Sequence, residues 1–278
     1  GINHNGNLDS AISIVDSAIK AGAEIIKHQT HVVDDEMANA AKKVIPGNSK
    51  KSIYQIVNEV ALSENDEKKL MNYIVNKKKI FFSSPFSRKA VDRLEKFGVP
   101  LYKIGSGECN NYPFVEYICK KKKPIILSTG MNTLKTIEPA VKIIRKYKLP
   151  YVLLHCTNVY PTPHKLVRLN AMLELKKKFK DAIIGLSDHS ETIYTSLGAV
   201  SMGACVIEKH YVTTKKTKGP DVSSSMDFDE LKELIKGSKI IYESKEGKKV
   251  PIKEEAKTIA FAFASPADVK NIKKDEKL

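Results

Sequence analysis

The chain has 278 residues, and its 47 Lys and Arg residues outnumber its 32 Asp and Glu residues, giving a formal net charge of +15 at pH 7. A chain of this length buries about 75% of its unfolded surface, so it needs neither disulfides nor a metal to hold a core. No apolar stretch approaches the roughly 20 residues of a membrane span, so we expect no contact with a membrane. The 4 cysteines show no CxxC spacing, which indicates free thiols, buried or near a site, in a reducing cytoplasm.

The positive charge is concentrated in lysine runs that fall where predicted helices end, before the next strand. These runs are Lys77–Lys79, Lys120–Lys123 and Lys176–Lys178. Cations at that position complement the negative end of a helix dipole and stay in water. Because no aromatic residues are interleaved with them, we expect no nucleic-acid partner, although the charge helps to attract anionic substrates by long-range steering.

The first 100 residues alternate between strand and helix patterns. A first strand is represented by residues 1–3 and is followed by an amphipathic helix over 8–21. Strands are predicted at 23–30 and 79–86, with helices at 64–76, where Ser63 and Asp66 form a capping box, and at 87–97. The segment 31–62 between them is too long for a simple loop, and we expect it to cover a site.

From residue 101 to 211, short apolar runs recur, each followed by a polar cluster and a helix-like stretch. The runs lie at 101–108, 124–130, 151–157, 182–189 and 204–210. They are rich in Ile, Val and Leu and do not alternate, which is typical of strands buried on both faces of a parallel sheet. With a last helix at 229–242, they complete eight strand–helix units, so residues 1–243 are predicted to form a (β/α)8 TIM barrel of the α/β class. The rim formed by the carboxyl ends of its strands is then the active face.

The composition changes after residue 243. Residues 244–258 are polar, charged and punctuated by Gly and Pro, which is typical of a linker. Residues 259–278 begin with an apolar run and then stop, so we expect them to be the incomplete start of a second domain.

Two histidines, His189 and His210, end the last two predicted strands. Neighbouring strands lie about 4.8 Å apart, so two imidazoles at adjacent strand ends can share one cation. Two nitrogens without a cysteine pair leave positions open for water and substrate, which favours Mn²⁺, with Mg²⁺ or Co²⁺ as alternatives, over a closed zinc site.

A second group of rim side chains offers hydrogen-bond donors suited to a dianion together with a carboxylate. Lysines supply point charges, and hydroxyls and the backbone amides of 105–107 and 128–130 supply directional bonds. The group consists of Lys27, Ser84, Lys103, Ser106, Ser128, Asn158 and Ser187. Lys27 or Lys103 could equally be a Schiff-base lysine, because amine activation depends on desolvation that a sequence does not display.

Four further residues stand just beyond this donor group. They are Gln29, Glu108, Tyr160 and Asp221, and they offer the acceptors and donors that a polyhydroxylated ligand needs. Asp221 follows a Gly-Pro pair, where an Asp is usually a turn residue.

The order of these motifs resembles that of bacterial sialic acid (N-acetylneuraminate) synthases over nearly the whole chain. The matching stretches are GINHNG (1–6), AGAEIIKHQT (21–30), SSPFS (83–87), YKIGSGECNNYP (102–113), ILSTGM (126–131), LLHCTNVYPTP (153–163), IGLSDH (184–189), EKH (208–210) and KGPDVSSSM (218–226). The segment VIPGNSKKSIYQI also resembles the subgroup that uses the unphosphorylated sugar. The resemblance implies a transferase of carbohydrate biosynthesis that condenses phosphoenolpyruvate with an N-acetylated hexose, N-acetylmannosamine. The products are N-acetylneuraminate and phosphate, which leaves by cleavage of its carbon–oxygen bond.

The resemblance also implies a role for each rim residue. His189 and His210 would bind the metal that polarises the sugar aldehyde, and Lys27 and Glu108 join them as catalytic residues. The donor group would hold phosphoenolpyruvate, and Gln29, Glu108, Tyr160 and Asp221 would contact the sugar or its acetamido group.

In this family a Glu of the first strand lies two residues before the position of Gly1. A carboxyl-terminal antifreeze-like (SAF) domain crosses to the partner subunit of a homodimer and contributes an Arg. FAFASPADVKNIKKDEKL resembles the opening of that domain. We therefore expect a fragment truncated at both ends, with an incomplete active site.

Three alternatives stay open. The same chemistry on another sugar would give legionaminic or pseudaminic acid, and only the sugar pocket distinguishes these products. A Schiff-base aldolase on the same barrel would form a borohydride-trappable adduct at Lys27 or Lys103. A non-catalytic basic binding module would lack metal and phosphoenolpyruvate binding.

Overall fold

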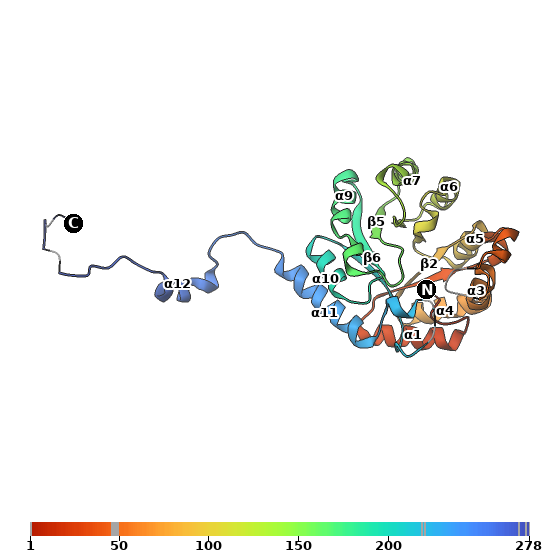
Figure 1. The fold of residues 1–278 in the computed structure, drawn as a ribbon, viewed down its shortest axis with the longest axis horizontal. Coiled ribbons are helices and arrows are strands. Elements are labelled where there is room, and N and C mark those ends of the chain that lie inside the picture. Colours follow the sequence, from red (N-terminus) through yellow and green to blue (C-terminus); the bar gives the residue numbers. More distant parts are fainter. Residues whose placement is uncertain are drawn as a thin grey trace. The chain divides into compact units, whose positions relative to one another are not determined.

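Eight parallel strands form one curled sheet in sequence order, and helices surround it (Figure 1). The strands are β1 Ile25–Thr30, β2 Ile80–Pro85, β3 Tyr102–Ile104, β4 Ile125–Ser128, β5 Tyr151–Cys156, β6 Ile183–Asp188, β7 Val206–Tyr211 and β8 Ser225–Met226. This arrangement confirms the predicted (β/α)8 barrel.

The computed structural model describes residues 2–45, 50–217, 219, 221–271, 273–275 and 277. Residues 46–49 of the predicted covering segment, and Lys218 and Pro220 of the loop after β7, lie outside the described residues. The chain divides into two units, Gly1–Ser244 and Lys245–Leu278. In the parts of the chain that the structure describes, no helix is long and apolar enough to cross a membrane.

The helices of the first unit form a ring around the strands. They are α1 Leu8–Ala21, α2 Val33–Glu36, α3 Ile53–Val60, α4 Glu64–Asn76, α5 Arg88–Phe97, α6 Tyr112–Cys119, α7 Leu134–Lys146, α8 His164–Val167, α9 Asn170–Lys178, α10 Tyr194–Ser201 and α11 Phe228–Ser244. Short 3₁₀ turns are η1 Asn39–Lys43, η2 Ser106–Glu108 and η3 Val222–Ser224. Helix α11 contacts both α10 and α1, so the last helix of the ring meets the first. The second unit contains η4 Lys253–Glu255 and α12 Ala256–Ala262.

Polar side chains cap the starts of α4 and α5. The cap at Ser63 was predicted, but the Asp66 carboxylate accepts from the Ser63 hydroxyl at 2.9 Å and not from its amide, so only half of the predicted capping box forms. The side chain of Ser63 accepts a hydrogen bond from the Asp66 amide at 3.1 Å at the start of α4, and Ser87 does the same for Ala90 at 3.2 Å at the start of α5. Such caps satisfy amides that have no partner within the helix. The lysine runs follow α4 and α6 and end α9, as predicted.

The prediction of a first strand at residues 1–3 is wrong for the described residues. The Asn5 amide donates to the carbonyl of Ile2 at 3.0 Å, so this backbone forms a turn instead of joining a ladder. The run predicted as the eighth strand, 204–210, is β7, and the eighth strand observed, β8, lies between that run and the predicted last helix at 229–242. It pairs His210 with Ser225 and Tyr211 with Met226. Within the described ranges, no ladder joins β8 to β1.

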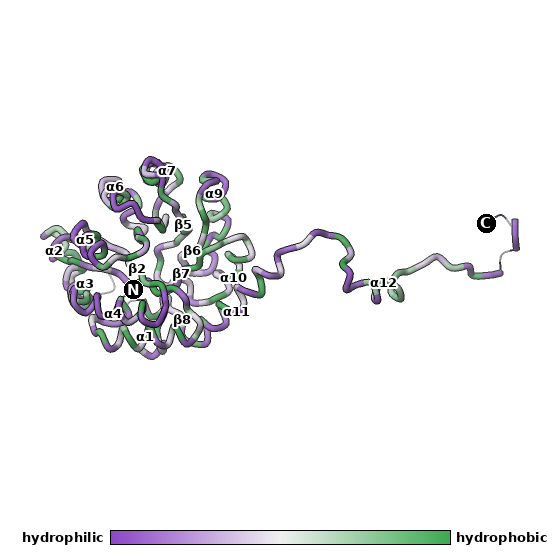
Figure 2. The backbone as a smooth tube through the Cα atoms, turned by 180° about the vertical axis from the view of Figure 1, so that it is seen from behind, coloured by the Kyte–Doolittle hydropathy of each residue, from purple (hydrophilic) through white to green (hydrophobic). Residues whose placement is uncertain are grey.

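Successive side chains of each strand face opposite sides, which separates two apolar clusters. The larger one fills the space between strands and helices and includes Tyr102, Ile104, Leu127 and Leu186. The smaller one, which we call the apolar floor, consists of Phe82, Ile126 and Leu154 inside the barrel. In Figure 2 the helices alternate between hydrophobic and hydrophilic colours along their turns, consistent with one face packed on the sheet.

The cysteines are free thiols, as predicted, but they differ in exposure. Cys109, Cys119 and Cys156 are buried, whereas Cys205 is exposed. Burial raises the pKa of the Cys109 and Cys119 thiols to about 12. Cys205 lies just before β7, at the end opposite the rim, so the expectation of a buried or site-adjacent thiol does not hold for it.

Candidate functional site

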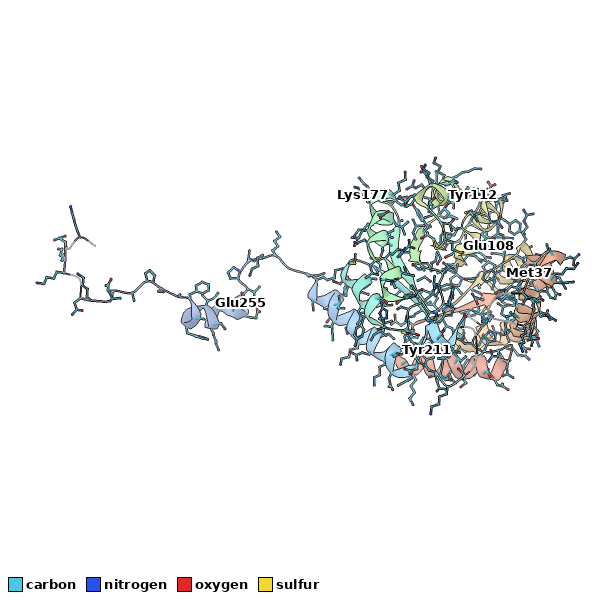
Figure 3. All side chains as sticks on the ribbon, viewed as in Figure 1. Met37, Glu108, Tyr112, Lys177, Tyr211 and Glu255 are labelled. Atoms are coloured by element: carbon cyan, nitrogen blue, oxygen red, sulfur yellow. The ribbon has the colours of Figure 1, made fainter. Side chains whose placement is uncertain are left out.

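A layer of polar side chains lies inside the barrel above the apolar floor. The adjacent residue on the same strand packs outward in each case, against the helices. Ile104 follows Lys103, Leu127 precedes Ser128, and Leu186 precedes Ser187. The same alternation applies on β7, where Tyr211 (labelled in Figure 3) faces α1 and hydrogen-bonds Ser17 at 2.6 Å. His210 and Glu208 therefore face inward. We call Lys27, Lys103, Ser128, Ser187 and Glu208 the polar layer.

Glu208 is the centre of the polar layer, and the sequence analysis missed it. One carboxylate oxygen, Oε1, lies 3.3 Å from the Lys27 ammonium and 3.1 Å from the Lys103 ammonium. The Ser187 hydroxyl donates to the same oxygen at 3.2 Å. Burial raises the pKa of Glu208, but the charges of Lys103 and Lys27 outweigh it and hold that pKa well below its usual range. Three of the predicted anion-binding groups thus converge on one partly buried carboxylate.

The Lys103 side chain is almost fully enclosed, with 4% of it exposed. Burial lowers the pKa of its ammonium, and the nearby charge of Lys27 acts in the same direction, whereas Glu208 opposes both. Glu208 therefore favours the cationic form of a lysine that burial alone would push toward the neutral amine.

Gly130, after β4, lies against two side chains of the rim, those of Ser106 and Asn158. The Gly130 amide donates to the Ser106 hydroxyl at 3.0 Å, and a Cβ on Gly130 would lie 1.8 Å from the Asn158 Oδ1. The Cys156 thiol in turn donates to that Oδ1 at 3.3 Å. A larger residue at position 130 would therefore displace the Asn158 or Ser106 side chain.

The Ser128 hydroxyl is buried and has no hydrogen-bond partner among the described residues. Ser128 lies at the carboxyl end of β4 and is 2% exposed. A buried hydroxyl without a partner is costly, so this atom is suited to a ligand or an ordered water.

The two predicted metal ligands are brought together. The ring centroids of His189 and His210 are 5.3 Å apart with an interplanar angle of 39°. His189 Nδ1 lies 2.9 Å from the Thr157 carbonyl, a contact in which the ring N–H donates and leaves Nε2 with a free lone pair. Burial lowers the pKa of both imidazoles, and Lys27 adds to the effect on His210, so both rings are neutral near pH 7.

Asp221 lies beside His210, with its Oδ2 3.4 Å from Nδ1 of the ring. A carboxylate at that nitrogen orients an imidazole and leaves Nε2 for a metal. Tyr160 packs on the other histidine, with its ring centroid 4.2 Å from that of His189. Both residues were predicted as sugar contacts, and the structure adds the neighbouring histidines as their partners.

Three further predicted site residues lie at or just beyond the carboxyl ends of strands β1, β2 and β3. Ser84 and Gln29 are register partners on β2 and β1, at the carboxyl ends of these strands. Glu108 (Figure 3) accepts a hydrogen bond from the Asn111 side chain at 2.7 Å. In the described parts of the chain, no cluster of three or more His, Cys, Asp or Glu residues is arranged to hold a metal.

Lysines, hydroxyls and a histidine pair gather at the carboxyl ends of the barrel strands, the end at which barrel enzymes carry their active sites. The chain belongs to the NeuB family, whose family model matches residues 14–250. An N,N'-diacetyllegionaminic acid synthase from Campylobacter jejuni is 38% identical over 99% of this chain and 85% of the relative. A pseudaminic acid synthase from the same species is 36% identical over 84% of this chain and 69% of the relative.

Among solved structures, the N-acetylneuraminic acid (sialic acid) synthetase from Leptospira borgpetersenii matches with a TM-score of 0.81 and 32% identity. The match covers 94% of this chain and 88% of that chain. These relatives confirm the prediction that this chain is a member of the sialic acid-type synthases. They are named for different products: legionaminic, pseudaminic and sialic acid.

Proposed function

We propose that this protein condenses phosphoenolpyruvate with N-acetylmannosamine to give N-acetylneuraminate and phosphate. The observation that carries the proposal is the convergence of two lysines, two neutral imidazoles and a buried serine hydroxyl at the active rim of a NeuB-family barrel. In the reaction, the methylene carbon of phosphoenolpyruvate bonds to the sugar aldehyde, water adds to the former enol carbon, and phosphate leaves with the bridging oxygen.

The polar layer would hold the phosphoenolpyruvate anion. Lys27 and Lys103 supply charge, while Ser128, whose hydroxyl has no partner among the described residues, and Ser187 supply directional donors. Ser84, Ser106 and Asn158 extend this set along the rim. Because Glu208 already draws both ammoniums to one point, the lysines need little rearrangement when the anion arrives, which favours stabilisation of charge in the transition state.

The histidine pair fits a divalent cation, because burial lowers the pKa of both imidazoles, the Thr157 carbonyl holds His189 through Nδ1, and the Asp221 carboxylate lies 3.4 Å from the Nδ1 of His210. When bound there, a cation such as Mn²⁺ would supply Lewis-acid polarisation of the sugar aldehyde. His189 and His210 would hold it through Nε2, with Mg²⁺ or Co²⁺ as alternatives. The Thr157 carbonyl and the Asp221 carboxylate, each beside the Nδ1 of one ring, would orient the two imidazoles.

The sugar would lie above the polar layer, next to Gln29, Glu108, Tyr160 and Asp221. Tyr160 and Asp221 already contact the histidine pair, so a sugar bound to them would place its aldehyde beside the cation. Lys27 and Glu108 complete the proposed catalytic group with the two histidines. We further propose that the protein acts in the cytoplasm as a homodimer and that residues 259–278 belong to an antifreeze-like domain that follows a linker.

The second candidate is the same condensation on the precursor of legionaminic or pseudaminic acid. It is favoured by the identities of 38% and 36% to synthases of these acids. Its anion and metal groups would be the same, so the choice depends on the groups around Gln29 and Tyr160.

The proposal is tested with the protein expressed from its complete coding sequence, supplied with Mn²⁺, phosphoenolpyruvate labelled with ¹⁸O at the bridging oxygen, and each candidate sugar in turn. We expect labelled phosphate and N-acetylneuraminate with N-acetylmannosamine. Labelled phosphate only with another sugar would establish the second candidate. Borohydride trapping of a covalent adduct at Lys27 or Lys103 would replace both by an aldolase, and lack of Mn²⁺ and phosphoenolpyruvate binding by calorimetry would reject an enzyme of either kind.

A further inference from the structure

A buried ion pair lies directly behind the histidine pair, on the helix side of the sheet. The Lys209 ammonium is 3.2 Å from the Asp188 Oδ2, and the two side chains are 1% and 0% exposed. Asp188 immediately precedes His189 on the chain, and Lys209 immediately precedes His210. Because successive side chains alternate between faces, the ion pair points outward where the imidazoles point inward.

Asp188 and Lys209 are also register partners of strands β6 and β7, and theirs is the last pair of that ladder before the rim. A slip of one residue in either strand would turn its histidine from the barrel interior to the helix side. The ion pair is placed where it fixes the register that brings the two imidazoles together.

Lys209 holds the backbone on both sides of His189. Besides Asp188, its ammonium donates to the Ser190 carbonyl at 2.6 Å, and the Ser190 amide donates to the Asp188 Oδ1 at 2.8 Å. Thr195 and Ser196 of α10 donate to the Asp188 Oδ2, each at 2.7 Å. The residues before and after His189 are thus tied to one cation, so the ring has a fixed point of attachment.

Stability alone does not account for this network. Replacing a buried ion pair by apolar residues is often neutral or stabilising, because desolvation of both charges offsets their attraction. A fully hydrogen-bonded pair does, however, specify one geometry among several compact alternatives. The ion pair lies one residue from each candidate metal ligand. The geometry that it specifies is therefore the spacing of His189 and His210.

We infer that Asp188 and Lys209 are positioning residues for the proposed metal site, holding His189 and His210 at the separation that one divalent cation requires. The inference rests on the proposed function. Partners that orient metal ligands typically contribute about 10- to 100-fold to metal affinity. We therefore expect Asp188→Asn, which keeps the shape and loses the charge, to weaken Mn²⁺ binding about tenfold or more.

The test is calorimetric titration of the apoprotein with Mn²⁺, together with urea unfolding followed by circular dichroism. The matched control is Glu67→Gln, which removes the carboxylate of another buried pair, 3.2 Å from Arg93 and remote from the two histidines in the sequence. We expect the control to lose stability and keep its Mn²⁺ affinity. If Asp188→Asn fails to fold, the double variant Asp188→Asn/Lys209→Met leaves no unpaired buried charge and is titrated instead.

The outcomes separate the inference from the function on which it rests. A folded Asp188 variant that binds Mn²⁺ as tightly as the wild type would overturn the positioning role. His210→Ala distinguishes the other case: if it binds Mn²⁺ like the wild type, the proposed metal site itself is wrong. Loss of binding in His210→Ala together with weakened binding in Asp188→Asn supports both.

Discussion

Glu208→Gln tests the electrostatics of the polar layer most directly, because it removes one charge and almost no volume. Each ammonium, at 3.1 and 3.3 Å, attracts the carboxylate by about 5 kcal/mol if the effective dielectric constant is about 20. Most of this is offset by the desolvation of the charges, and breaking one partner of a buried pair typically costs about 3–5 kcal/mol. Since 17% of the side chains of Lys27 and Glu208 is exposed, we expect the lower value, a loss of about 3 kcal/mol in the free energy of unfolding.

The measurement is urea unfolding at neutral pH, without and with saturating phosphate. The folded-state pKa of Glu208 lies below the ordinary value of 4.5, so its contribution is complete above that pH and is lost as the pH falls further. Phosphate should stabilise the variant more than the wild type, because an anion replaces the missing charge. The control is Glu116→Gln at an exposed ion pair with Lys146, where we expect no measurable change. A variant as stable as the wild type without phosphate would refute the assignment of Glu208 as the counter-ion of the two lysines.

Three further predictions concern single side chains. Lys103→Ala should raise the Michaelis constant for phosphoenolpyruvate about 10- to 100-fold, as loss of a charged hydrogen bond does, and steady-state kinetics with an unchanged constant would remove Lys103 from the anion site. Gly130→Ala should weaken phosphoenolpyruvate binding measured by calorimetry, because the added Cβ would lie 1.8 Å from the Asn158 side chain. In the control Gly107→Ala the added Cβ has no atom within 4 Å, and we expect this variant to bind phosphoenolpyruvate normally. Burial, and after it the charge of His4, hold the pKa of His28 well below 6.5. Below pH 6.5 the unfolded chain therefore binds a proton that the folded chain does not, and the free energy of unfolding falls as the pH falls. His28→Gln should make this fall shallower by up to about 1.4 kcal/mol per pH unit in urea unfolding, and an unchanged slope would contradict the shift.

The strands and their inward-facing residues were predictable because burial on both faces leaves a strong local signal. The run predicted at 79–86 is β2, Ile80–Pro85, and the predicted closeness of His189 and His210 is confirmed by their centroid distance of 5.3 Å. The roles assigned to the rim residues, the cation and the domain boundaries stay predictions.

What the sequence analysis missed has physical causes. Glu208 lies two residues before His210 on one strand, so the period of two places both inward. A carboxylate has the wrong charge to bind an anion, and its role as counter-ion of two lysines depends on the fold. β8 is formed by two residues, too few for any pattern, and its pairing depends on contacts distant in sequence. Asp221 follows a Gly-Pro pair typical of turns, and only the fold brings it to His210.

The exposure of Cys205 gives this protein a natural attachment point for a spectroscopic reporter. Burial raises the pKa of the Cys109 and Cys119 thiols to about 12 and also raises that of Cys156, so a maleimide spin label would react first at Cys205. His210 lies five residues further along the chain, a path of about 17 Å. A paramagnetic ion such as Mn²⁺ bound between the imidazoles would speed the relaxation of a nitroxide at Cys205. The relaxation rate of the label would then report how much of the proposed metal site is occupied.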